Sequence, residues 1–178
     1  EQCQLSIEDD NKIYIIVSST GSPASELISV FTKKEYNHVS ISFDKDLKTI
    51  ISYNGGNHVQ QPGLNVEDLQ SFYQKEDSNI LVYSLQATRE QKQKLLNKIR
   101  KINSEGSAYN LVGLVTKVSL KPNIMFCSQF VYSMLKEVNL HYFEMPETLV
   151  KPTDFIEKDY YKKLHFEYEI KFSEYKPN

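Results

Sequence analysis

The segment that decides the fold reads IMFCSQFVYSML and spans residues 124–135. Its apolar side chains recur at spacings that share one face of a helix, which predicts a core helix running to about residue 139. Cys127 falls in the first turn, where free backbone N–H groups and the helix dipole favour a thiolate. Cys127 is therefore a candidate nucleophile, with a buried structural cysteine as the alternative. The apolar set is Phe130, Val131, Met134 and Leu135.

Composition indicates one globular domain over residues 1–178, with residues 1–11 expected to be mobile. The chain is 40% hydrophobic and 25% charged, with a formal net charge of -2 and no basic patch that would suggest a nucleic-acid partner. No apolar run is long enough for a transmembrane segment and no signal peptide opens this sequence, which favours a cytoplasmic location. The oligomeric state stays open.

The two cysteines, Cys3 and Cys127, form no CxxC pair or His/Cys cluster, so we expect no metal and no cofactor. A disulfide between them would stabilise the fold little, because one of its ends would lie in an N-terminal segment expected to be mobile.

Alternation and β-branched runs predict strands, and capping signals predict helices between them. The stretch 58–79 lacks clear periodicity and is expected to be mostly loop. Hairpins and helices are segregated, so the fold class is predicted to be α+β with an antiparallel sheet packed against the cysteine helix. The predicted strands are 12–17, 38–43, 47–53, 80–85 and 165–172, and the predicted helices are 23–31, 88–103, 109–118, 124–139 and a short turn near 155.

His38 is the best candidate base for the thiol. A cysteine hydrolase needs an imidazole on a rigid element to take the thiol proton and later protonate the leaving group. His38 opens an alternating strand and shares a face with Ser40 and Ser42, away from the apolar set. The other histidines, His58, His141 and His165, fall where a solvated or structural role is the default.

A third group should hold the imidazole by its other nitrogen, and the hairpin partner strand is its natural source. With the turn near residues 45–47, Ser52 or Tyr53 lies near the strand end opposite His38. Ser52 is favoured, although a hydroxyl orients a ring less strongly than a carboxylate does.

The segments EYNHVSI (35–41) and FCSQFV (126–131), in that order, resemble the permuted NlpC-type papain-like cysteine peptidases. This is the YiiX/YaeF-like branch, related to lecithin retinol acyltransferase. The resemblance covers roughly residues 12–154, including YNLVGL (109–114) and VKPTDF (150–155). It implies a papain-like fold in permuted order, with the histidine hairpin before the cysteine helix.

The resemblance also implies roles for single residues. Cys127 would be the nucleophile, His38 the base and Ser52 the third member, a position where related enzymes often have histidine or a carboxylate. The loop 18–22, with Ser19 and Gly21, would lie near the site, where its N–H groups and that of Cys127 could stabilise an oxyanion. Tyr109 would line the cleft, with a packed core tyrosine as the equal alternative.

The expected function is that of a cysteine amidase or peptidase acting on a cell-wall or other peptide. The first alternative is a lipid acyltransferase or thioesterase of the same superfamily, with a lipid acyl chain as substrate. The second is a binding module that has kept the fold and lost turnover, which the hydroxyl at Ser52 motivates.

Overall fold

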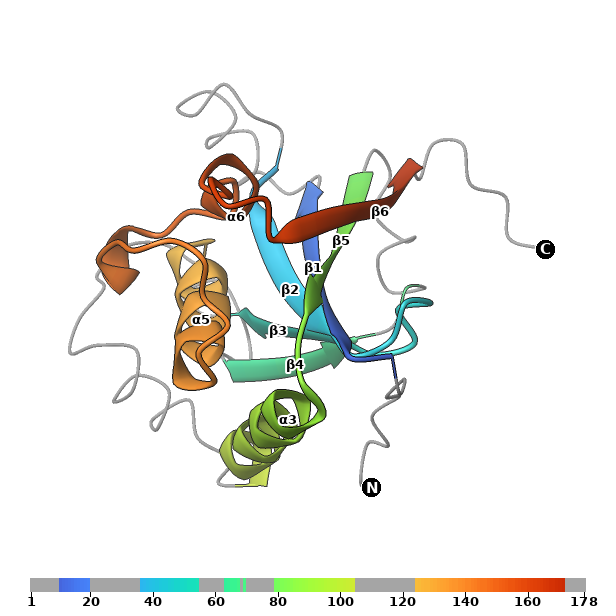
Figure 1. The fold of residues 1–178 in the computed structure, drawn as a ribbon, viewed down its shortest axis with the longest axis vertical. Coiled ribbons are helices and arrows are strands. Elements are labelled where there is room, and N and C mark those ends of the chain that lie inside the picture. The colour runs from blue at the N-terminus through green and yellow to red at the C-terminus, as the bar shows by residue number, and fades with distance from the viewer. Residues whose placement is uncertain are drawn as a thin grey trace.

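The structure is a computed structural model that describes residues 10–19, 36–54, 63–67, 69, 79–104 and 124–171. The strands are β1 (Lys12–Ser19), β2 (His38–Ser42), β3 (Ile50–Asn54), β4 (Gly63–Glu67), β5 (Asn79–Gln86) and β6 (Leu164–Lys171). The helices are α3 (Arg89–Ser104), α5 (Ile124–Glu137) and α6 (Asp154–Glu157), with a 3-10 turn η1 (Glu147–Leu149). The six strands form one sheet in the order β4-β3-β2-β1-β5-β6 (Figure 1), and every neighbouring pair is antiparallel.

Strand β1 is a central strand because its β-branched residues can be buried on both faces. Ile13, Ile15 and Val17 belong to the larger hydrophobic core, whereas Tyr14 and Ile16 belong to a second cluster on the opposite face. The strand predicted for residues 12–17 is confirmed, and it continues through residues 18 and 19.

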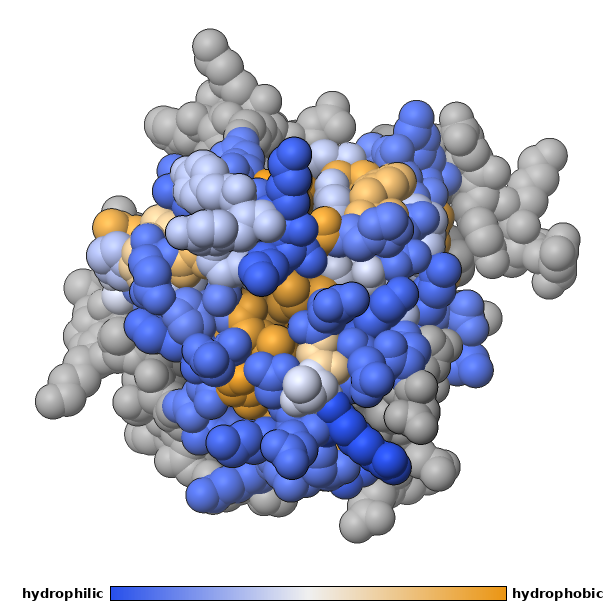
Figure 2. Space-filling model, in the orientation of Figure 1, coloured by the Kyte–Doolittle hydropathy of each residue, from blue (hydrophilic) through white to orange (hydrophobic). Residues whose placement is uncertain are grey.

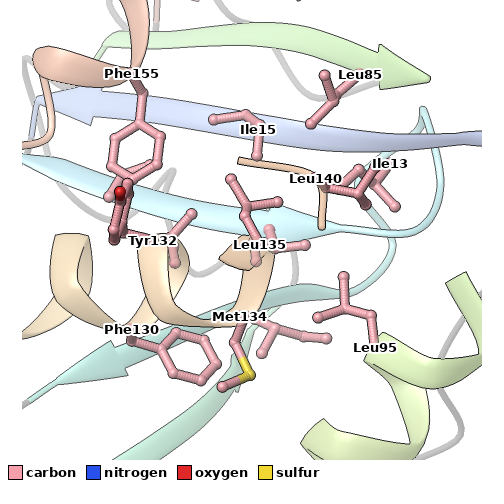
Figure 3. Packing of buried hydrophobic residues seen from close by; sticks show 14 of the residues in the cluster. Ile13, Ile15, Leu85, Leu95, Phe130, Tyr132, Met134, Leu135, Leu140 and Phe155 are labelled. Carbon is pink, nitrogen blue, oxygen red and sulfur yellow. The ribbon is translucent and has the colours of Figure 1, made fainter. Parts of the chain in front are cut away.

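The larger core fills the space between the sheet and helices α3 and α5. The apolar stripe predicted for α5 is fully buried. Figure 3 shows Leu135 of α5 beside Ile15 of β1, and Leu95 of α3 on the side of the cluster away from Phe155. Phe130 stacks on Tyr53 of β3, with ring centroids 6.0 Å apart. Helix α5 therefore lies against β2 and β3, the strands of the predicted histidine hairpin.

Helix α3 begins as its capping box predicts. The N–H of Gln91 donates to Thr88 Oγ1 at 3.1 Å, and the N–H of Thr88 donates to Gln91 Oε1 at 2.9 Å. The amide Nε2 of Gln91 also donates to the carbonyl of Val138, 3.0 Å away, which ties the start of α3 to the end of α5.

The turn between β2 and β3 is longer than the predicted tight turn, because it closes on side chains. Ser42 Oγ donates to the carbonyl of Thr49 at 2.7 Å, and the Asp44 carboxylate accepts the N–H groups of Lys48 and Thr49. Leu47 takes a positive φ of 55°, an uncommon conformation for a bulky residue. Its side chain is fully buried in the second cluster, which accounts for that conformation.

Strand β4 lies within residues 58–79, which were expected to be mostly loop; apart from residues 63–67, 69 and 79, that segment falls outside the described residues. Residues 63–67 pair along their whole length with β3, from Ile50–Glu67 to Asn54–Gly63. Apolar Leu64 and Val66 alternate with polar Asn65 and Glu67, which is the strand pattern, although only five residues carry it.

Two residues of the segment expected to be mobile are held in place. The Asp10 carboxylate accepts a hydrogen bond from Tyr14 and pairs with the buried ammonium of Lys92 at 2.9 Å, and the carbonyl of Asn11 accepts the N–H of Ala87 at 2.9 Å. Residues 1–9 lie outside the described part of the chain.

The fold class is α+β with an antiparallel sheet, as predicted. The predictions for residues 23–31 and 109–118 fall outside the described residues. In the described chain the histidine strand β2 precedes the cysteine helix α5, and helices α3 and α5 cover the same face of the sheet.

Candidate functional site

Cys127 is the fourth residue of α5 and is only 1% exposed. It belongs to the larger core because Phe130, Val131 and Met134 follow it on the buried side of the helix. It is also a free cysteine, not part of a disulfide.

Burial raises the pKa of the Cys127 thiol from 9.0 to about 12. The backbone N–H groups of Val39, Ser128 and Cys127 itself act in the opposite direction, but they do not offset the loss of solvation. The expectation that the first helical turn favours a thiolate is therefore wrong for this buried state. Removing a charge from water outweighs the field of a helix terminus.

The Val39 N–H places the sulfur next to the backbone of β2, one residue from the predicted base. Strand β2 pairs with β1 over all five residues, but the pairing of β2 with β3 covers only Ile41–Ile51 and Ser42–Ile50. Toward its start, β2 therefore runs past the end of the β3 ladder, and the N–H of Val39 is directed at the Cys127 thiol there. His38 is the preceding residue, so α5 and β2 bring the thiol to the backbone beside the histidine.

The register defines which face of the sheet His38 occupies. His38 pairs with Ser18 of β1, and Ser40 pairs with Ile16 of the second cluster. His38, Ser18 and Ser40 thus share the face turned away from the larger core, which agrees with the predicted alternation. Cys127 belongs to the larger core, so the register puts the two candidate side chains on opposite faces of the sheet. His38 is partly buried.

Ser52 occupies the same face as His38. Ile50, two residues earlier on β3, pairs with Ser42 and belongs to the second cluster, and residues two apart on a strand share a face. It lies one step beyond the last β2–β3 pair, across from Ser40 and two residues along from His38. Its side chain is fully buried, and Ser52 Oγ has no hydrogen-bond partner among the described residues.

The remaining predicted site residues are placed as follows. Ser19 is the last residue of β1, where its Oγ accepts the N–H of Asn79 at 3.0 Å, so it ends a strand and does not belong to a loop. Gly21 and Tyr109 lie outside the described residues.

The other described histidines lie on other parts of the chain, outside strands β1, β2 and β3. His141 Nε2 lies 2.6 Å from the Glu144 carboxylate, and His165 is an exposed residue of the edge strand β6. His58 lies outside the described residues.

Sequence reasoning missed several buried polar side chains around Cys127. Ser128 Oγ donates to the carbonyl of Val150 at 2.6 Å, which ties the cysteine turn to the segment before α6. Gln129 is fully buried, and neither amide atom has a partner among the described residues. Polar residues inside an otherwise apolar helix stretch were the available signal.

Two grooves of the described surface lie elsewhere. One, of about 1320 Å³, runs along the ends of β1, β5 and β6, and the other, of about 750 Å³, lies between β5 and the segment after α5. Neither is lined by Cys127 or His38. On the face seen in Figure 2, a central hydrophobic area is framed by hydrophilic residues.

Within the described residues, no group of three or more His, Cys, Asp or Glu side chains is arranged to hold a metal ion. In the same residues, the helices are too short or too polar to cross a bilayer. Comparison of the sequence with protein-family models and with curated proteins finds no match.

Proposed function

We propose that this protein is a cysteine hydrolase that cleaves an amide bond, with Cys127 as nucleophile and His38 as base. The observation that carries the proposal is the Val39 N–H directed at the Cys127 sulfur. It sets a thiol on α5 beside Val39, which directly follows His38 on strand β2. The register turns the His38 side chain to the other face of the sheet, so the reaction requires the ring to reach around the start of β2, where the β3 ladder has ended. Nucleophile and base on two packed rigid elements are what such a reaction requires.

The reaction proceeds through an acyl-enzyme. His38 removes the thiol proton as the sulfur attacks the substrate carbonyl, and an S–C bond forms. The tetrahedral oxyanion collapses, the C–N bond breaks, and the imidazolium gives its proton to the leaving amine. A water molecule then attacks the thioester, His38 takes its proton, and the acid is released as the proton returns to the sulfur.

Because the Cys127 thiol is buried, it has to be deprotonated during the reaction. With a pKa of about 12, Cys127 is protonated at neutral pH, so no resting thiolate–imidazolium pair exists. Proton removal by His38 therefore accompanies attack, as in serine hydrolases. Backbone N–H groups near the sulfur, including that of Ser128, supply partial positive charge for the developing anion.

The family proposed for the chain is the permuted NlpC-type papain-like group. It is supported by the order of the elements, with histidine strand β2 before cysteine helix α5, and by the packing of α5 on β2 and β3. Peptide amides are the proposed substrates, with cell-wall peptides as the first class to test.

A binding module without turnover is the second candidate. One observation favours it, which is that Cys127 is 1% exposed and its pKa is raised by burial.

An acyl-transfer probe, such as a peptide thioester or activated amide, separates the two candidates. We expect acylation of Cys127, detected by mass spectrometry of the intact protein and its peptides. We also expect acylation to be lost in Cys127→Ala and to fall by at least 100-fold in His38→Gln, since general-base catalysis contributes about 10²–10⁴-fold. His165→Gln is the matched control, because it changes an exposed histidine on an edge strand. No acylation, or acylation equally fast in His38→Gln, would refute the hydrolase and favour the binding module.

A further inference from the structure

The two grooves of about 1320 and 750 Å³ meet at the end of strand β5. Their linings share Leu85, Gln86 and Lys163, so together they form one continuous depression, which we call the joined groove. One part runs along the start of β1, the end of β5 and the start of β6, and the other part lies between β5, the segment after α5 and the segment between α6 and β6. Cys127 and His38 line neither part, so an inference about the joined groove does not depend on the proposed function.

Positively charged side chains line the joined groove in excess. Two carboxylates also line it, and each is already engaged, since Asp10 pairs with Lys92 at 2.9 Å and Glu144 contacts His141 at 2.6 Å. None of the five lining Lys and Arg side chains forms an ion pair with a residue that the structure describes. A chain with a formal net charge of -2 thus gathers unpaired positive charge in one depression. The five are Lys12, Arg89, Lys158, Lys162 and Lys163.

The floor of the joined groove is apolar. Leu85, Leu140 and Phe143 line it, and each is less than a tenth exposed and belongs to the larger core. A ligand in the groove therefore meets apolar side chains at the base and cations at the rim. A site of this kind suits a ligand that combines negative charge with an apolar group.

Two exposed tyrosines stand at the rim of the same groove. Tyr160 and Tyr161 are 72% and 75% exposed, and neither belongs to a hydrophobic cluster of the described chain. The turn that bears them is held by its backbone, because the Asp159 carboxylate accepts the N–H groups of Lys163 at 2.7 Å and Leu164 at 3.0 Å. Tyrosine is enriched at binding hot spots, since its ring supplies a large contact area and its hydroxyl a hydrogen bond.

We propose that the joined groove is a docking site for an acidic peptide segment of a partner protein. Carboxylates of the segment pair with the rim cations, and one of its apolar side chains lies on the floor between Leu140 and Phe143, against the rings of Tyr160 and Tyr161. Because the rim cations have no ion pair to break, their attraction for the segment is not offset by the loss of an internal pair.

A nucleic-acid strand fits the joined groove less well than a peptide does. Binding a phosphate backbone depends on a continuous row of cations, because each phosphate carries a charge. The carboxylates of Asp10 and Glu144 lie among the cations here, and Asp159 lies within the tyrosine turn. A peptide can place its acidic residues opposite the cations and its uncharged residues opposite these carboxylates.

Fluorescence anisotropy with a labelled peptide tests the proposal. The probe is a short peptide of four glutamates around a central phenylalanine, and its control has glutamine in place of each glutamate. We expect the acidic peptide to bind saturably and the glutamine peptide to bind at least tenfold more weakly. Affinity for the acidic peptide should also fall as salt rises from about 50 to 500 mM, because salt screens exposed charges. An oligothymidine of similar length is titrated in parallel.

Charge removal at the rim has a matched control. Lys158→Gln combined with Lys163→Gln should weaken binding of the acidic peptide by about tenfold, since each exposed ion pair contributes a few-fold. Lys94→Gln combined with Lys171→Gln removes the same charge from exposed residues that line neither part of the groove, and should leave the affinity within twofold of wild type.

The aromatic rim is tested by a variant and by a measurement on the wild type. Tyr160→Ala combined with Tyr161→Ala should weaken binding at least tenfold, as expected for hot-spot aromatics. Amide chemical shifts of wild-type protein, recorded as the acidic peptide is added, require no substitution; those of Gln86, Tyr160 and Tyr161 should move, and that of Lys94 should not.

Several results would overturn the docking site. They are no binding of the acidic peptide at about 1 mM, equal affinity for the glutamine peptide, an equal loss in the Lys94 and Lys171 control, or unmoved amides along the joined groove. Tighter binding of oligothymidine than of the acidic peptide, through the same residues, would assign the groove to a nucleic-acid strand and equally refute a peptide partner.

Discussion

Alkylation of Cys127 by iodoacetamide should be slow in the folded protein and should accelerate with pH far above the neutral range. The change from 9.0 to about 12 in pKa lowers the thiolate fraction at neutral pH by about 1000-fold, since each unit is a factor of ten. A more basic thiolate is a better nucleophile, so the rate constant of the thiolate itself rises by roughly 20-fold for a Brønsted coefficient of about 0.45. The net expectation is a rate roughly 50-fold below that of an exposed cysteine, before the limited access to a buried sulfur slows it further.

The assay uses a Cys3→Ser background, so that Cys127 is the sole thiol of the chain. Iodoacetamide is added at about pH 7.5, and labelling is followed by mass spectrometry in native buffer and in denaturing urea, where the thiol takes its ordinary pKa of 9.0. The ratio of the two rates isolates the effect of the fold on this one thiol.

Labelling of folded Cys127 within a few-fold of the unfolded rate would refute this reasoning. It would mean that the sulfur is solvated or already ionised, so that desolvation does not dominate its pKa. Slow alkylation together with rapid, His38-dependent acylation is the combination that attack assisted by a general base requires.

Three further predictions concern stability. The pKa of Cys127 is higher in the folded than in the unfolded state, so the thiol's contribution to stability is fully present below about pH 9 and is lost as the pH rises toward 12. In urea titrations over that pH range, the free energy of unfolding of the wild type should fall by up to about 4 kcal/mol more than that of Cys127→Ala. Thr88→Ala removes one bond of the capping box of α3 and should lower the free energy of unfolding by about 1 kcal/mol in urea titrations, and an unchanged midpoint would contradict the cap. Asp10→Asn deprives the buried Lys92 ammonium of its charged partner and should lower the melting temperature more than Lys92→Met does; equal losses would show that the pair is solvated.

The sequence predicted those helices and strands that are specified by residues close together in the chain. The capping box at Thr88 specifies the start of α3, because both of its hydrogen bonds are between residues three apart. The alternation beginning at His38 identifies β2 and the face of its histidine, because period two follows from strand geometry alone. The apolar spacing after Cys127 likewise predicts the buried face of α5.

Features that depend on distant partners were not predictable in the same way. Strand β4 pairs with β3 along its whole length. Leu64 and Val66 alternate with Asn65 and Glu67, but this short pattern inside a segment without clear periodicity did not identify a strand. The Cys127 pKa depends on how completely the fold covers the sulfur, whereas the sequence left open both a thiolate at a helix start and a buried structural cysteine. The early end of the β2–β3 ladder is also a property of the assembled sheet, and it determines where the sulfur lies.

The separation of β2 from β3 links the fold to the proposed chemistry. A strand that leaves its neighbour exposes backbone N–H groups that must find acceptors. The Val39 N–H meets the Cys127 sulfur, so one interaction both satisfies the strand and holds the thiol beside His38. Had the ladder continued for two more pairs, the partner strand would have satisfied that N–H. The short β2–β3 pairing therefore determines where the Cys127 sulfur meets the backbone of β2.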